Sequence, residues 1–108
     1  MKPSDLVQGT LDMLILRTLA LEPMHGYGIA LRIEQISRGV FRVNPGSLFP
    51  AFRRLERGGW VEPDWRPTEN NRRAKFYTLT NLGRKQLKAE TEEWGKQLAA
   101  ITRIMEAS

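Results

Sequence analysis

The order of helical and extended segments constrains the fold of this chain more than any other sequence feature. Proline and glycine residues divide its first half into three helical segments, which we place at residues 10–21, 26–38 and about 44–57. Two β-like segments follow, at residues 60–65 and 73–79. A long helix then runs from a Thr80 cap to about Met105. This order predicts a mainly α-helical protein with one two-stranded hairpin directly before its last helix.

The sides of the helices that face the core can be read from their apolar spacing. These residues are Ile29, Ile33 and Ile36 in the second helix, and Leu48, Phe52 and Leu55 in the third. The third helix has two possible starts, because Asn44 followed by Pro45 is one and Ser47 as N-cap is the other. Pro50 favours the later start, since proline is tolerated only in the first turn of a helix.

The first and last helices carry more apolar surface than one small core covers. In the first helix, one face carries Leu11, Leu14, Ile15 and Leu19, while another carries Met13, Leu16 and Ala20. The last helix has a seam spaced 4-3-4-3-4, formed by Leu87, Thr91, Trp94, Leu98, Ile101 and Met105. We therefore expect a homodimer whose interface contains Leu11, Met13, Leu16, Leu87, Trp94, Leu98, Ile101 and Met105.

Composition limits the classes of protein and of site. The 108 residues and 12.4 kDa fit one domain, and residues 1–8 are expected to form a short arm. The chain has no cysteine and one histidine, which argues against disulfides and a histidine-rich metal site, so we expect no metal and no cofactor. No apolar run approaches the roughly 20 residues of a membrane span, and no signal peptide is evident. We expect a cytoplasmic protein without a membrane partner.

Positive charge is concentrated just past the middle of the chain. The formal net charge is +5. Residues 66–85 hold six Lys and Arg side chains against Glu69 alone, so this segment accounts for the whole excess. Arg53, Arg54 and Arg57 precede it with only Glu56 between them. Such a single-sign cluster predicts an edge that binds a polyanion.

The third helix and the hairpin together have the arrangement of a winged helix-turn-helix. A helix fits the major groove of double-stranded DNA, and a basic hairpin can contact the backbone beside it or enter the minor groove. The residues expected to bind DNA are Ser47, Phe49, Pro50, Arg53, Arg54, Arg57, Arg66, Asn71, Arg72, Arg73 and Lys75.

Four motifs in this order resemble those of the PadR family of bacterial transcription regulators. They are QGTLD at residues 8–12, HGYG at 25–28, GSLFPAFRRLE at 46–56 and KFYTLTNLG at 75–83. The resemblance implies a winged-helix DNA-binding domain, here residues 1–80, and a dimerisation helix, here residues 81–108. It also implies repression of nearby genes, relieved in some members by planar aromatic effectors. The family usually has tyrosine at the position of Phe49, which cannot donate a hydrogen bond to phosphate but can pack on a sugar or a thymine methyl.

Other interpretations remain open at this stage. The winged helix can serve as a protein-interaction module, or the chain can be an aromatic sensor without a DNA role. An enzyme is not expected, because no nucleophile, acid/base pair or metal site can be named. His25 is expected to be a turn or capping residue. Trp94 either packs in the dimer interface or lines a cleft where it stacks on a planar aromatic effector.

Overall fold

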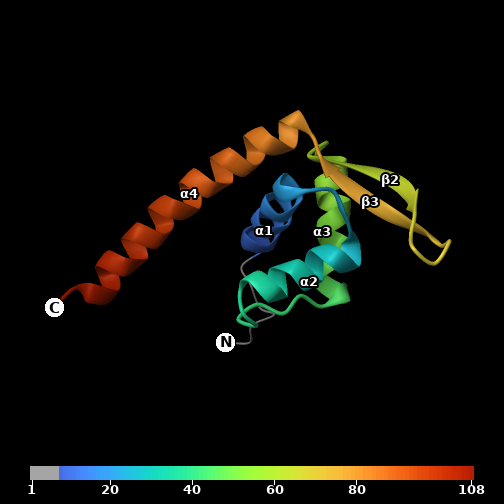
Figure 1. Ribbon diagram of the computed structural model, residues 1–108. Helices are drawn as coiled ribbons and strands as arrows, with labels where there is room; N and C mark the ends of the chain where they lie inside the picture. The colour runs from blue at the N-terminus through green and yellow to red at the C-terminus, as the bar shows by residue number, and fades with distance from the viewer. Residues whose placement is uncertain (1–7) are drawn as a thin grey trace.

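The computed structural model describes residues 8–108, which form four helices and three strands (Figure 1). In chain order they are α1 (Gln8–Leu21), β1 (Met24–His25), α2 (Gly26–Ile36), α3 (Pro45–Arg57), β2 (Val61–Pro67), β3 (Arg73–Leu79) and α4 (Asn81–Glu106). The expected fold class is confirmed, with three helices, a hairpin wing and a long C-terminal helix. The arm expected at residues 1–8 lies outside the described residues, apart from Gln8, where α1 begins.

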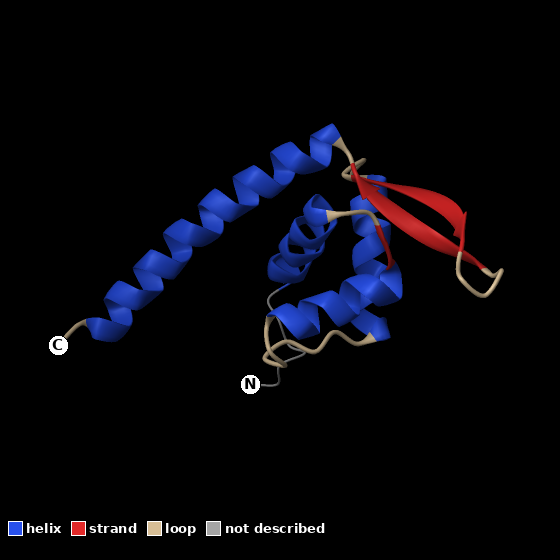
Figure 2. Ribbon diagram, in the orientation of Figure 1, coloured by secondary structure: helices blue, strands red, loops and turns tan. Residues whose placement is uncertain are grey.

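The wing, formed by β2 and β3, belongs to a three-stranded antiparallel sheet with the strand order β1-β3-β2. Val61 pairs with Leu79 at its base, and Pro67 pairs with Arg73 near its tip. The sequence did not predict β1, because two residues are too few to show an alternating pattern (Figure 2). Since β1 leads directly into α2, it ties the wing to the helical part of the molecule.

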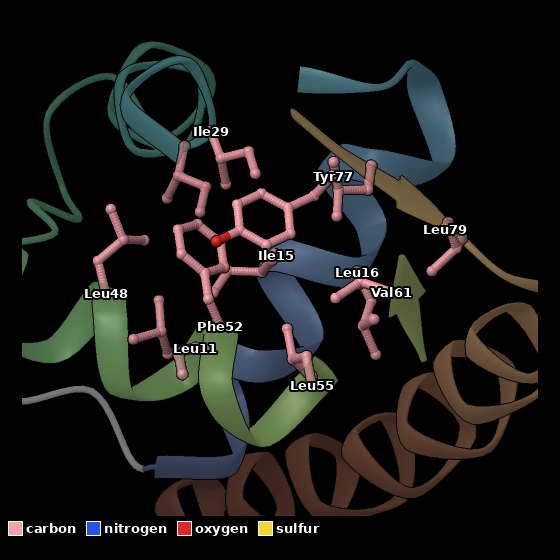
Figure 3. Close-up of a cluster of buried hydrophobic side chains, with 13 residues drawn as sticks. Leu11, Ile15, Leu16, Ile29, Leu48, Phe52, Leu55, Val61, Tyr77 and Leu79 are labelled. Carbon is pink, nitrogen blue, oxygen red and sulfur yellow. The ribbon is translucent and has the colours of Figure 1, made fainter. Parts of the chain in front are cut away.

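Side chains from α1, α2, α3 and the base of the wing form one hydrophobic core (Figure 3). The rings of Phe52 and Tyr77 stack within it with their centroids 4.3 Å apart, which joins α3 to β3. The buried hydrophobic residues are Leu11, Ile15, Leu16, Leu19, Ile29, Ile33, Leu48, Ala51, Phe52, Leu55, Val61, Tyr77 and Leu79. This core holds α3 and the wing in a fixed relation to each other.

α4 leaves the core after its first turns and extends away from the other helices (Figure 1). Thr80 caps it, because the hydroxyl oxygen accepts a hydrogen bond of 3.0 Å from the amide of Gly83. Gly83 is buried, and its α-carbon lies close to the backbone carbonyl of Trp60. Leu87 packs against the core, whereas every residue from 91 to 108 is exposed. Most of α4 therefore has no cover within the protomer.

α3 begins earlier than the sequence favoured. The side-chain oxygen of Asn44 accepts a hydrogen bond of 3.0 Å from the amide of Ser47, and Pro45 occupies the first turn. The later start with Ser47 as N-cap is therefore wrong, and Pro50 lies inside the helix. Pro50 and Gly46, four residues earlier, are both exposed, so water can reach the carbonyl group that loses its amide partner.

Two further expectations need correction. Ile36 is 62% exposed rather than buried, because α2 ends at this residue and the chain turns away. Arg38 and Gly39 make this turn with φ angles of 54° and 80°. β2 is longer than expected and reaches Pro67, so Arg66 belongs to a strand rather than to the turn of the hairpin.

Candidate nucleic-acid interface

One side of α3 is exposed and carries aromatic and basic side chains. The core takes up the opposite side of this helix through its apolar residues. Beyond Pro45 and Gly46 at its start, the exposed residues of α3 are Phe49, Pro50, Arg53 and Arg57. A helix turns by about 100° per residue, so these four side chains project within an arc of about 100°. The structure thus brings four of the predicted DNA contacts onto one surface.

Arg54 does not belong to this surface. Its guanidinium forms a bidentate ion pair with the carboxylate of Asp12 on α1, with Nη2 to Oδ1 at 2.8 Å and Nε to Oδ2 at 3.2 Å. Hydrogen bonding to Asp12 raises the pKa of Arg54, so the group stays charged and paired. Arg54, which was expected among the DNA contacts, is therefore a half-buried cation whose charge Asp12 compensates. Ser47 is half-buried and stands seven residues before Arg54, on the same flank of the helix.

The two faces of the wing differ in charge, because successive residues of a strand point to opposite faces. The face that continues from the core carries Trp65, Lys75 and Arg73, and the other face carries Glu62, Asp64 and Arg66. Arg66 pairs with Asp64 at 2.9 Å, and its guanidinium carbon lies 5.3 Å from the ring centroid of Phe76. Arg66 is thus a paired charge on the face away from Trp65 and Lys75.

The tip of the wing presents the remaining basic residues of the hairpin. The amide and the hydroxyl of Thr68 both donate hydrogen bonds to the carbonyl of Arg72, at 2.7 and 2.8 Å. Asn71 has a φ of 58°, a left-handed conformation that asparagine adopts more readily than most residues. Asn71, Arg72 and Arg73 are all exposed. The turn therefore holds two cations and an amide in solvent.

A cleft of about 470 Å³ connects α3 to the wing. It is lined by His25, Gly26, Tyr27, Phe49, Phe52, Arg53, Glu56, Trp65, Ala74, Lys75 and Tyr77. Since the α3 residues Phe49 and Arg53 share this cleft with the wing residues Trp65 and Lys75, the two elements form one continuous concave surface. We call it the α3–wing surface, and it comprises the exposed side of α3, this cleft and the tip of the wing.

Lys75 lies in the cleft as a paired charge. Its Nζ is 2.9 Å from a carboxylate oxygen of Glu56, and this hydrogen bond raises the pKa of Lys75. Beside it, burial raises the pKa of the Tyr77 phenol. Because Glu56 already compensates its charge, Lys75 attracts a polyanion less strongly than an unpaired cation does.

Four arginines carry the unpaired positive charge of the α3–wing surface. Arg53 and Arg57 stand on α3, and Arg72 and Arg73 stand at the wing tip. In the part of the chain whose side chains are described, residues 10–108, none of the four forms an ion pair. Exposed guanidinium groups have the fork of donors that matches phosphate oxygens and guanine edges.

Two exposed aromatic residues of this surface were not expected from the sequence. Tyr27 is 80% exposed at the start of α2, and Trp65 is 57% exposed on the wing. Neither exposure can be read from the sequence, since both are residue types that also occur in cores and burial depends on how the elements dock. His25 does cap α2 as expected, because its Nδ1 accepts a hydrogen bond of 3.0 Å from the amide of Gly28.

The residues expected in a dimer interface fall into three groups by exposure. Trp94, Leu98, Ile101 and Met105 are exposed on α4, and Leu87 and Met13 are half-buried. Leu11 and Leu16 are buried within the protomer, so their assignment to the interface is corrected. The reason is that α2, α3, β3 and the start of α4 all pack against α1 and leave these two side chains no free surface.

The described residues provide neither a membrane-spanning helix nor a cluster of metal ligands. None of the helices between residues 8 and 108 combines the length and the apolar character that crossing a bilayer requires. The same part of the chain places no three His, Asp or Glu side chains together where they could hold a metal ion.

Comparisons with known proteins relate this geometry to a family. Residues 15–89 match the model of the transcriptional regulator PadR-like family. An uncharacterized protein from Lysinibacillus sphaericus is 29% identical over 103 residues, which cover 95% of this chain and 94% of that protein. The structure of a transcriptional regulator from Clostridium thermocellum is 29% identical and superposes with a TM-score of 0.84, covering 93% of this chain and 97% of the other.

A PadR-like transcriptional regulator from Bacillus cereus also has the same architecture. It superposes with a TM-score of 0.82 over 97% of this chain and 100% of the other, at 22% identity, which supports the fold. The family match extends from α1 through the wing into α4 and so includes the whole α3–wing surface. The chain therefore belongs to the PadR-like family of transcriptional regulators.

Proposed function

We propose that this protein represses transcription as a homodimer bound to a pseudo-palindromic operator. The observation that carries the proposal is a set of four exposed arginines on the α3–wing surface, two on α3 and two at the wing tip, which have no ion-pair partner among residues 10–108. A family of DNA-binding transcriptional regulators is the expected context for such a surface.

In this proposal α3 lies in the major groove and the wing follows the flanking backbone. Arg53 and Arg57 reach phosphates or guanine edges, and Phe49 packs on a sugar or a thymine methyl. Arg72 and Arg73 contact backbone phosphates or the edge of the minor groove. The exposed rings of the α3–wing surface add apolar contact with the sugars between these charged groups.

Dimerisation through α4 supplies the second half of the DNA-binding unit. Trp94, Leu98 and Ile101 follow the spacing of a coiled-coil seam and are exposed in the protomer. A contiguous exposed apolar stripe of this kind is typical of a protein–protein interface. Two-fold symmetry then predicts two half-sites about one helical turn apart, or a multiple of it.

The DNA-binding role is tested with a duplex that the protein itself selects from a pool of random sequences. The affinity for this duplex is measured at increasing salt concentrations. The wild-type protein should lose affinity steeply between low and physiological salt. The double variant Arg72→Ala plus Arg73→Ala should weaken binding similarly on all sequences. It should also lower the salt slope, which is the dependence of the logarithm of the binding constant on the logarithm of the salt concentration, by up to ~2. Lys96→Ala plus Arg103→Ala on α4 removes the same charge away from the proposed interface and should leave the slope unchanged.

The two possible failures of this experiment have different meanings. An unchanged slope in the wing variant would remove the wing from the interface while leaving α3 in place. Binding that is weak and insensitive to salt in the wild-type protein would instead favour a protein-interaction module.

The proposal also includes a planar aromatic effector, whose binding dissociates the protein from its operator. Trp94 is 42% exposed on α4, so its ring can pack in a dimer and still offer a face to a flat ligand. Titration of planar aromatic compounds should quench tryptophan fluorescence in the wild-type protein, and the variant Trp94→Leu should lose this response. Release of labelled operator in the same titration distinguishes an effector from a sensor without a DNA role, and no quenching would remove the effector from the proposal.

A further inference from the structure

We infer that the Asp12–Arg54 ion pair positions α3 relative to α1, and that Arg54 acts through this pair rather than by touching DNA. The inference rests on the proposed DNA-binding function, because it concerns how the α3–wing surface is aligned. Its structural basis is a bidentate contact between residues 42 positions apart in the sequence, which joins the first helix to the third.

The pair is the most buried ion pair in the described part of the molecule. The side chains of Asp12 and Arg54 are 12% and 30% exposed, whereas those of Glu56 and Lys75, the next most buried pair, are 28% and 37% exposed. Buried ion pairs often contribute no more to stability than apolar residues of the same size would. A planar bidentate contact does restrict the relative orientation of the two groups that form it, whereas apolar packing is not directional. Orientation of α3 is therefore the property that this pair is suited to control.

The position of the pair connects the dimerisation part of the chain to the DNA-binding part. α1 packs against α4, which carries the exposed seam, and α1 also holds Asp12. Arg54 follows Arg53 directly on α3, so a rotation of the helix about its axis that displaces one displaces the other. Phe52 and Leu55 set how deeply α3 sits in the core, while the fork between Arg54 and Asp12 fixes its rotation and tilt.

Binding phosphate through the edge of the Arg54 guanidinium that carries Nε and Nη2 would require the ion pair to break, because Asp12 occupies that edge. The carboxylate of Asp12 would then remain in a site where the residue is 9% exposed, without its partner. Leaving a buried charge unpaired is costly. DNA can bind Arg53, Arg57, Arg72 and Arg73 at lower cost, since none of them has to leave an ion-pair partner among residues 10–108, and Arg54 keeps its internal partner.

The variant Asp12→Asn separates the two roles, because they predict effects of opposite sign. Removing an acidic charge raises the net charge from +5 to +6, which alone would strengthen binding to any duplex. Positioning predicts that the folded dimer loses about tenfold in operator affinity, which corresponds to about 1.4 kcal/mol. Affinity for a non-specific duplex should stay equal or increase, and the salt slope on the operator should be preserved.

Arg54 variants complete a double-mutant cycle. Arg54→Met should weaken operator binding as Asp12→Asn does, and the combination of both should be no weaker than Arg54→Met alone, since the two residues act as a unit. Arg54→Lys keeps the charge but loses the fork, so it should resemble Arg54→Met. If thermal unfolding shows that Asp12→Asn does not fold, Arg54→Lys carries the test.

Two controls identify what each result means. Glu22→Gln removes one acidic charge from an exposed pair with Arg32, at 3.5 Å, and should not weaken operator binding. Arg57→Met removes a proposed DNA contact from the same helix and should weaken operator and non-specific binding together, with the salt slope lower by about one.

Operator binding by Asp12→Asn at wild-type strength or tighter would overturn the inference. So would Arg54→Lys at full affinity combined with a reduced salt slope in Arg54→Met, since that result would make Arg54 an ordinary phosphate contact. Failure of the proposed function is seen separately, in the wild-type protein, as the absence of salt-dependent binding.

Discussion

At the scale of single residues, neighbours on one helix meet different surroundings. Arg53 and Arg54 have the same chemistry, but one step of about 100° around α3 places Arg53 in solvent and Arg54 against α1. On the wing, Arg66 and Arg73 differ in the same way, since Arg66 is paired with Asp64 and Arg73 has no acidic partner among residues 10–108. The electrostatic character of each arginine is therefore set by its partner rather than by its place in a basic segment.

Gly83 and Gly95 lie in the same helix and should respond oppositely to alanine. A Cβ at Gly83 would overlap the backbone carbonyl of Trp60, which cannot move aside as a side chain can. Gly83→Ala should therefore lower the free energy of unfolding by about 3 kcal/mol. A Cβ at Gly95 meets nothing within 4 Å, so Gly95→Ala should raise the free energy of unfolding by up to about 1 kcal/mol.

Urea unfolding of both variants measures these changes. Equal stabilities for the Gly83 variant and the wild-type protein would show that the start of α4 is not held against the end of the α3–β2 connection.

At the scale of elements, local signals allowed most of the fold to be predicted and distant contacts explain the remainder. Pro23, the Gly58-Gly59 pair and the Thr80 cap mark element ends by their own backbone chemistry, so the helices and the hairpin were placed within a few residues. The short strand β1 has only two residues, which are too few to show the alternation of apolar and polar residues that predicts a strand. The pairing of Arg54 with Asp12 and the burial of Leu11 and Leu16 on α1 depend on docking between segments far apart in the chain, which no local pattern reports.

The start of α3 can be tested by comparing two polar residues near its N-terminus. Asn44→Ala removes the side-chain oxygen that accepts from the amide of Ser47, and should cost about 1 kcal/mol of stability. Ser47→Ala removes a hydroxyl that caps nothing in this arrangement and should change stability by less than about 0.5 kcal/mol. Denaturant unfolding that ranks the two variants in the reverse order would restore Ser47 as the cap.

At the scale of the whole molecule, α4 makes the protomer elongated. The protomer measures 59 × 28 × 21 Å along its principal axes, because the last helix projects well beyond the packed helices and the wing. The seam on this projection is an apolar stripe that the protomer leaves exposed. A second copy would cover it and would also set the separation of the two α3–wing surfaces.

Substitution of adjacent α4 residues tests this arrangement. Leu98→Glu places a carboxylate in the seam and should convert the dimer to monomer, with weaker operator binding as a consequence. Ala99→Glu introduces the same charge one residue away from the seam, and should leave the dimer intact. Analytical ultracentrifugation at micromolar concentration distinguishes them, and a dimer that persists in Leu98→Glu would place the interface elsewhere.

The strand order leaves β2 as an edge strand, and its sequence has a consequence for self-association. Alternate residues of a strand direct their amide groups to the same side, and two of the four positions 61, 63, 65 and 67 of β2 are proline. Prolines are found on edge strands where the side without a partner strand needs no donor. Another strand arriving at this border would find too few amide hydrogens to extend the sheet, so the wing is protected from amyloid-like stacking even when it is not shielded by a duplex.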